Sequence, residues 1–280
     1  MSKLALMRRI LVALLLLVSL ATAQQPPNVV EVFREFDRIA AQPLWPGFEP
    51  RSIAVEVYDG ANTYLYHHPK PPDGFRPLEA APGVLVYPGQ HETVRANTGT
   101  ELNGVPTATA DLSKGARSAR EAASLLIHET FHVYEKKAHP KWAANEADLF
   151  LYPVEDWDLL YRRWRETAGL VDALRSSNEI EARCAADWAL LERQERFSKM
   201  SPGAVAYERG TELNEGLAQY VEYKSIGKPA ALQRDDFPLE LIRQRGYATG
   251  QAFALLLDRF APDWKTKIGH TPLDGCYRHR

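Results

Sequence analysis

The chain has 280 residues, of which 45% are hydrophobic and 25% charged, a composition typical of a globular protein with a sizeable core. Its formal net charge of −2 offers no basic surface of the kind that nucleic-acid binding requires, so we expect no nucleic-acid partner. The length allows one large domain or two small ones.

Residues 1–23 have the pattern of a secretory signal peptide. Three basic residues come first, an apolar run over 10–20 follows, and an A-x-A cleavage site ends the segment. The apolar run is shorter than the roughly 20 residues that a membrane-spanning helix needs. We therefore expect export to the periplasm or beyond, no stable membrane span after cleavage, and a mature chain over 24–280. The oligomeric state stays open.

The next part of the chain is predicted to form one helix and then a series of β-strands. Residues 29–41 have helical periodicity, and residues from about 50 to 112 have the short alternating runs and turn signals of strands. The pattern predicts a hairpin and two further strands, at 53–66, 84–87 and 107–110.

The run His128-Glu129-Thr130-Phe131-His132 carries the clearest chemical signal. On a helix, two histidines four residues apart share one face and can bind one zinc ion. Glu129 then lies beside the metal, where it could take a proton from a bound water. Ser118 and Glu121 form a capping box that predicts the start of this helix, and His139-Pro140 predicts its end.

The rest of the chain, from about 117 to 270, reads as mostly helical. We expect helices near 155–174, 179–197, 202–226 and 239–260, with their aromatic residues in the core. A small N-terminal sheet followed by a helical body is an α+β pattern, which we expect to form a single domain over 24–280. The two cysteines, Cys184 and Cys276, are equally compatible with one disulfide and with two free thiols.

A catalytic zinc site needs a third protein ligand. The metzincin extension H-E-x-x-H-x-x-G-x-x-H is excluded because position 135 is Glu and position 138 is Ala. A later helix offers carboxylates instead, and Gly216 and Ala218 on it favour close packing against the motif helix. Spacing alone leaves four candidates open: Glu208, Glu212, Glu215 and Glu222, of which the first, third and fourth repeat every seven residues on one face.

The segment 213–222, with the sequence LNEGLAQYVE, resembles the N-E-G-x-A helix of gluzincin metallopeptidases, the thermolysin-like clan, and especially its alanyl-aminopeptidase branch. The resemblance covers two helices, 118–137 and 207–224. It implies a zincin-like fold, a Zn²⁺ cofactor and Glu215 as the third ligand beside His128 and His132. Two departures stand out: 82 residues separate His132 from Glu215, and the aminopeptidase motif G-x-M-E-N is missing.

Members of this clan also use a Tyr or His donor for the oxyanion, and Tyr247, between small residues at the start of a helix, fits that role. Its rivals are Tyr220, Tyr223 and His270. Glu222 or Asp111 could orient a ligand histidine. The strand before the motif helix, 107–111, would be an edge strand that binds the substrate backbone.

These patterns lead to the hypothesis of an exported zinc metallopeptidase that acts on a peptide or protein substrate, with Glu129 as general base. Two alternatives remain: a zincin-scaffold binding protein with weak or no catalysis, in which the metal is structural, and a zinc hydrolase of a non-peptide amide.

Overall fold

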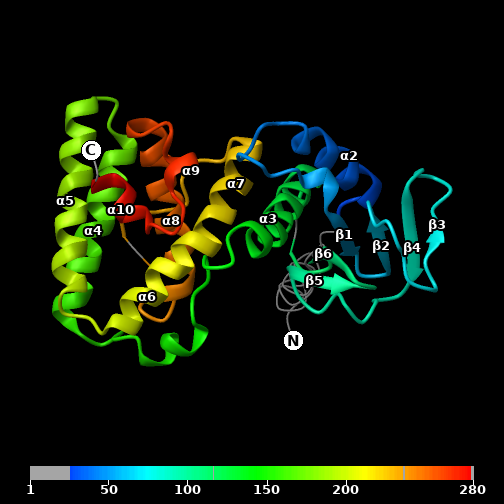
Figure 1. Cartoon of the computed structure of the whole chain (residues 1–280), viewed down its shortest axis with the longest axis horizontal. Helices are drawn as coiled ribbons and strands as arrows, with labels where there is room; N and C mark the ends of the chain where they lie inside the picture. The colour runs from blue at the N-terminus through cyan, green and yellow to red at the C-terminus, as the bar shows by residue number, and fades with distance from the viewer. Residues whose placement is uncertain (1–25, 116, 236, 279–280) are drawn as a thin grey trace, which may run out of the picture.

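The computed structural model describes residues 26–115, 117–235 and 237–278. The predicted signal peptide over 1–23 lies outside these residues. Two halves lie side by side along the long axis, a sheet with two helices and a body of helices (Figure 1). The halves meet where α3 (Ala119–Ala138) packs against α7 (Leu217–Ile226). The order along the chain, sheet first and helices after, agrees with the prediction from sequence.

Within the described residues the sheet has six strands in the order β3-β4-β2-β1-β6-β5. β1 and β6 pair in parallel, and every other neighbouring pair is antiparallel. The predicted hairpin is present as β1 and β2, and the predicted later strands are present as β4 and β6. The strands are β1 (Ala54–Tyr58), β2 (Asn62–Tyr66), β3 (Arg76–Pro77), β4 (Val84–Pro88), β5 (Thr98–Leu102) and β6 (Val105–Asp111).

The prediction that 107–111 forms the edge of the sheet is wrong. β6 lies between β1 and β5, and the edge strand next to α3 is β5. The sequence of β5, TGTEL, gave no strand signal because it contains a glycine and a single large apolar residue, at its end. Its strand conformation comes from pairing with β6, which is a long-range interaction.

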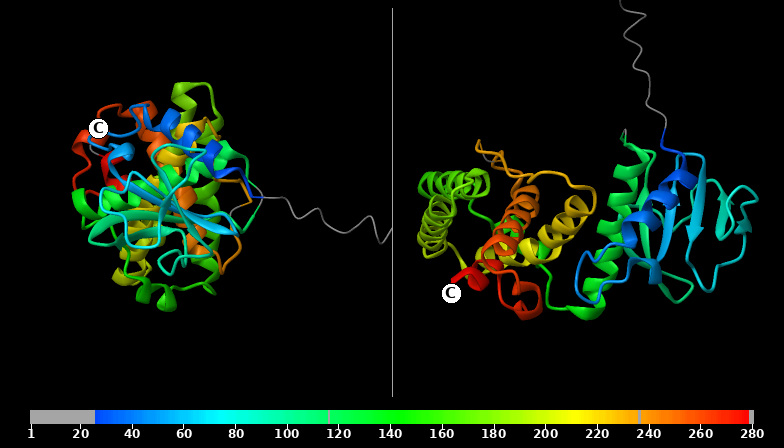
Figure 2. Two further views of the ribbon diagram at one scale, coloured as in Figure 1. Left: turned by 90° about the vertical axis from the view of Figure 1, so that its right-hand side faces the viewer. Right: turned by 90° about the horizontal axis from the view of Figure 1, so that it is seen from above.

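One face of the sheet is covered by α2 (Val29–Ala40) and α3, which lie on the same side of the strands (Figure 2, right). Apolar side chains of β1, including Val55 and Val57, point into the core that these helices share. Strand alternation sends Glu56 and Thr109 to the other face. There the loop after β4 covers them: Thr93 donates to Glu56, and Thr109 donates to the backbone of Ala96.

The other half is built from helices that come after α3. Two long antiparallel helices form its outer layer, and a second layer, between them and α3, carries α7 and α8 (Figure 1). The four predicted helices are present as α4 (Trp157–Arg175), α5 (Glu179–Phe197), the consecutive helical segments α6 (Pro202–Thr211), η3 (Glu212–Gly216) and α7, and α8 (Ile242–Phe260). Three short helices of this half were not predicted: η2 (Glu146–Leu151), α9 (Trp264–Lys267) and α10 (Leu273–Arg278). One short turn, η1 (Pro50–Ser52), precedes the sheet.

One prediction about this half is wrong. The aromatic residues of α4 were expected in the core, but Trp157, Tyr161 and Trp164 are exposed. The helical spacing placed them on one face, and that face points away from the core.

Cys184 and Cys276 are free thiols in the structure, the first exposed and the second partly buried. Across the described residues, no helix is both long enough and apolar enough to cross a membrane.

Candidate metal centre

The two histidines of the motif lie on a buried stretch of α3. The helix begins as predicted, with Ser118 as N-cap in a capping box with Glu121, and it ends before His139. His128 and His132 are one turn apart, and their Nε2 atoms face each other at 3.0 Å. The residues between 122 and 131 are buried, so the helix is fixed on nearly all sides.

Glu215 approaches the histidines from the other half of the molecule. Its Oε2 atom lies 3.1 Å from Nε2 of His132 and 3.6 Å from Nε2 of His128. Glu215 stands on η3, a π-helical turn between α6 and α7. The wider turn breaks the seven-residue repeat that relates Glu208 to Glu215. Glu208 accepts from Arg196 and Glu212 accepts from Arg193, so both carboxylates lie in the helical body, away from the histidines. The expectation that Glu208 shares a face with Glu215 and Glu222 is therefore wrong.

Glycines place this turn against α8. A Cβ atom on Gly216 would lie 2.6 Å from Cα of Gly250, which is far inside van der Waals contact. We expected Gly216 to allow close packing against the motif helix, but the helix that it approaches closely is α8. The neighbouring Ala218 is fully buried.

The three donor atoms have the spacing of a tetrahedral zinc site. Ligand bonds of about 2.0–2.1 Å at tetrahedral angles put donor atoms about 3.3 Å apart. The separations here are 3.0, 3.1 and 3.6 Å. Within the described residues, His128, His132 and Glu215 form a group that could hold a metal ion. Two imidazoles and one carboxylate are a donor set that Zn²⁺ accepts, and a metal held by three protein ligands would have a fourth position for a water or substrate.

Both histidines are oriented by carboxylates at their second nitrogen. Nδ1 of His128 lies 3.0 Å from Glu222, and Nδ1 of His132 lies 3.0 Å from Glu135. If each Nδ1 carries a proton and donates it, both Nε2 lone pairs point at each other and at Glu215. Lone pairs that converge repel unless a proton or a cation lies between them, and a single cation can contact all three donor atoms at once.

Of the two residues proposed to orient a histidine, Glu222 lies beside His128 and Asp111 does not. Asp111 interacts with Ser113 and Lys114 instead. It shares the sheet face of Glu56, because strand alternation on β6 turns it away from the side that α3 covers. Sequence reasoning missed Glu135, although its spacing of three residues from His132 on a helix was a usable signal.

A cleft of about 410 Å³ opens over the three donor atoms. Glu129 lines it and is itself buried. One wall is formed by the sheet edge and α3, and the other by η3, α7 and α8. The lining residues are Asn97, Thr98, Arg117, Leu125, His128, Glu129, His132, Lys136, Asn214, Glu215, Gln219, Glu222, Arg243 and Tyr247.

Tyr247 lies in this cleft, with its ring stacked toward His128 at a centroid distance of 6.2 Å. Its three rivals do not line it: Tyr220 donates to Asp258, and Tyr223 and His270 lie outside the cleft.

Sequence reasoning missed Arg243, one turn before Tyr247, because no motif contains it. Its guanidinium lies 2.6 Å from Oε1 of Glu215 and fixes the oxygen that faces away from the histidines.

The histidines and carboxylates of the site shift one another's pKa values. Burial lowers the pKa of each histidine, but hydrogen bonds to carboxylates outweigh it, so the pKa of His132 rises to about 9 and that of His128 also rises. Burial raises the pKa of Glu129, although both histidines oppose the shift. Hydrogen bonds from the histidines outweigh burial at Glu215 and lower its pKa. A divalent cation would compete for the positions that the imidazole protons take.

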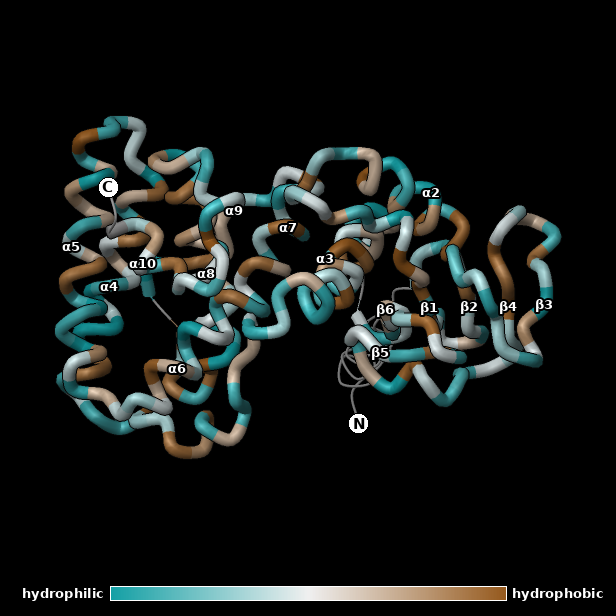
Figure 3. The backbone as a smooth tube through the Cα atoms, in the orientation of Figure 1, coloured by the Kyte–Doolittle hydropathy of each residue, from teal (hydrophilic) through white to brown (hydrophobic). Residues whose placement is uncertain are grey.

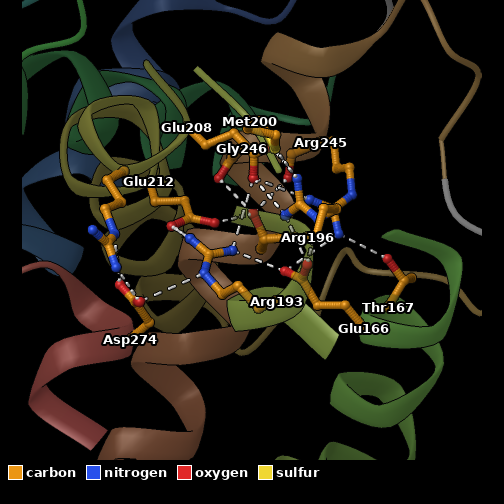
Figure 4. Close-up of polar contacts among 12 residues, drawn as sticks. Glu166, Thr167, Arg193, Arg196, Met200, Glu208, Glu212, Arg245, Gly246 and Asp274 are labelled. Atoms are coloured by element: carbon orange, nitrogen blue, oxygen red, sulfur yellow. Dashed lines mark hydrogen bonds and ion pairs between the residues drawn. The ribbon is translucent and has the colours of Figure 1, made fainter. Parts of the chain in front are cut away.

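A buried network of arginines and carboxylates supports the turn that carries Glu215 (Figure 4). Arg193 donates to Glu166 at 2.8 Å and to Glu212 at 2.5 Å, and all three side chains are buried. Thr249 of α8 donates to the other oxygen of Glu212. Arg196 binds both Glu166 and Glu208. The network thereby ties η3, the turn that also carries Glu215, to α4, α5 and α8.

Comparison with known proteins adds no identification: no protein-family model, curated protein or solved structure matches the chain.

Proposed function

We propose that the protein is an exported, zinc-dependent metallopeptidase of gluzincin type with a zincin-like fold. The observation that carries the proposal is the convergence of His128, His132 and Glu215, with Glu129 in the same cleft. A metal held only for stability has no need of a buried carboxylate beside it. Burial of an ionisable group without a full set of partners is costly, and such groups gather at functional sites.

In this proposal each group of the cleft has one task. A bound Zn²⁺ would act as a Lewis acid that polarises a carbonyl and makes a water acidic near neutral pH. Glu129 accepts the proton of the attacking water on its carboxylate and then delivers it to the nitrogen of the leaving amine. The raised pKa of Glu129 suits a group that must both take and give a proton.

Other residues orient the substrate and stabilise charge. Burial, together with Glu215, raises the pKa of Tyr247, so its hydroxyl stays protonated and can donate to the oxygen that becomes negative. Glu222 and Glu135 hold the Nδ1 protons of the two histidines. A peptide backbone would pair with β5, the edge strand whose first residue, Thr98, lines the cleft.

The test compares the wild type with Glu129→Gln, and with Glu92→Gln as a control at an exposed glutamate. Metal content is measured on all three proteins, and cleavage is followed by mass spectrometry on a mixed peptide library. We expect zinc in all three and a loss of about 10²–10⁴-fold in cleavage for Glu129→Gln alone. Zinc-loaded Glu129→Gln that cleaves like the wild type refutes the mechanism. Zinc in all three proteins without peptide cleavage by any of them would refute the peptidase proposal and leave a binding protein or a hydrolase of a non-peptide amide.

A further inference from the structure

The outer face of the α4–α5 layer exposes an apolar patch at the end of the molecule opposite the sheet. Hydrophobic segments recur along both helices there (Figure 3). On α4 the exposed aromatic residues follow the spacing i, i+4, i+7, which places them on one helix face. The patch consists of Trp157 (83% exposed), Tyr161 (54%), Trp164 (47%), Trp188 (36%) and Leu191 (61%).

The exposed tryptophans of the patch differ from the other tryptophans of the chain. The remaining tryptophans, Trp45, Trp142 and Trp264, are buried in the core. Three exposed tryptophans therefore gather on two adjacent helices, and nothing in the fold requires them there. A contiguous apolar patch of this kind marks an interaction surface more often than it is neutral.

The size of the patch fits a protein interface. A fully exposed aromatic side chain offers about 150–250 Å². With a similar value for Leu191, the exposed fractions of the patch amount to about 400–700 Å² of mostly apolar surface. A standard interface buries about 800 Å² on each partner, of which about 60% is apolar. The patch alone supplies about that apolar share.

The two arginines beside the patch are paired with carboxylates of the same two helices. Arg165 packs over the rings of Tyr161 and Trp188 and pairs with Glu192 at 2.7 Å. Arg162 pairs with both Glu192 and Asp158 at 3.3 Å. An anionic membrane or a nucleic acid would need unpaired cations at this face. A face that meets its own copy should instead carry little net charge, because two copies of a face with net charge repel each other.

We propose that this face binds a second copy of the chain in a two-fold symmetric dimer. Each copy contributes two antiparallel helices of 19 residues, about 28 Å long, which together would form a four-helix layer. The aromatic residues would pack against those of the partner, and the cleft on the far side of the helical body would stay open. The proposal does not depend on the activity of that cleft.

The test is sedimentation equilibrium of the wild type, Trp157→Ser and Tyr161→Ser over protein concentrations from nanomolar to about 100 µM. Leu239→Ser is the matched control, because Leu239 is also an exposed large apolar residue but belongs to neither helix. Circular dichroism checks that each variant is folded. We expect a wild-type dimer, a dissociation constant raised about 30-fold or more by each aromatic substitution, and no change for Leu239→Ser.

Tryptophan fluorescence provides a second readout, since dimer formation should shift the emission of the exposed tryptophans to shorter wavelength. A chain that stays monomeric at 100 µM overturns the proposal. So does a dimer that both aromatic variants leave unchanged, or a monomer that binds neutral or anionic lipid vesicles through this face.

Discussion

Replacing Arg193 by methionine should destabilise the protein strongly. Methionine keeps much of the arginine's length but removes the donors to Glu166 and Glu212, at 2.8 and 2.5 Å. Glu166 keeps a partner in Arg196 at 2.7 Å, so Glu212 is the carboxylate left without a cation. Removing one member of a buried ion pair costs about 3–5 kcal/mol. For a chain of this size that corresponds to a fall of about 6–20 °C in Tm.

Thermal and urea unfolding followed by circular dichroism measure this effect. Arg162→Met is the control, because Arg162 also pairs with two carboxylates but is partly exposed, and its loss should cost at most about 1 kcal/mol. The double variant Arg193→Met/Glu212→Gln should recover part of the loss, because it removes the buried carboxyl group that has lost its cation. If Arg193→Met is no less stable than Arg162→Met, the network does not hold the helices together as argued.

Three further predictions concern the same region. Glu222→Gln and Glu135→Gln should each weaken zinc binding about 10–100-fold in a chelator competition, and unchanged affinity would contradict their role in orienting the histidines. Gly250→Ala should cost about 1–3 kcal/mol in urea unfolding, because its Cβ would lie 2.5 Å from the carbonyl oxygen of Glu212; a change within error would count against that packing. Burial raises the pKa of Glu212 from 4.5 to about 7, so the stability it contributes is present below pH 4.5 and lost as the pH rises through 7. Glu212→Gln should therefore flatten the dependence of unfolding free energy on pH between 5 and 7, and parallel curves for the two proteins would refute this assignment.

Local signals in the sequence predicted the helices well. The capping box at Ser118 and Glu121 gave the start of α3. This signal depends only on side chains within one turn of the helix end, so it can be read from the local sequence. The identity of the edge strand could not be predicted, because β5 owes its conformation to pairing with β6 and carries little strand signal of its own.

In the candidate site too, local features could be predicted from the sequence and features that depend on long-range contacts could not. Four-residue spacing on one helix brought His128 and His132 together, whereas the choice of Glu215 rested on a resemblance. Its position in the structure depends on a π-helical turn that periodicity of 3.6 residues does not reveal. Arg243 reaches Glu215 from α8, through an approach between helices that no short pattern encodes. The exposed aromatic face of α4 was misassigned because spacing identifies a face but not what covers it.

The three donor atoms stand on both sides of the junction between the halves. Two belong to α3, which packs on the sheet, and the third belongs to η3, in the helical body, 83 residues further along the chain than His132. An ion bound there would act as a cross-link that exists only in the folded state, and such ligands stabilise that state in proportion to the logarithm of their concentration. Chelation should then loosen the junction first, with faster amide exchange in α3 and α7 and earlier proteolysis of the segment between α3 and α4. The same ion that would make the cleft reactive would also set the lifetime of the folded protein where free metal is scarce.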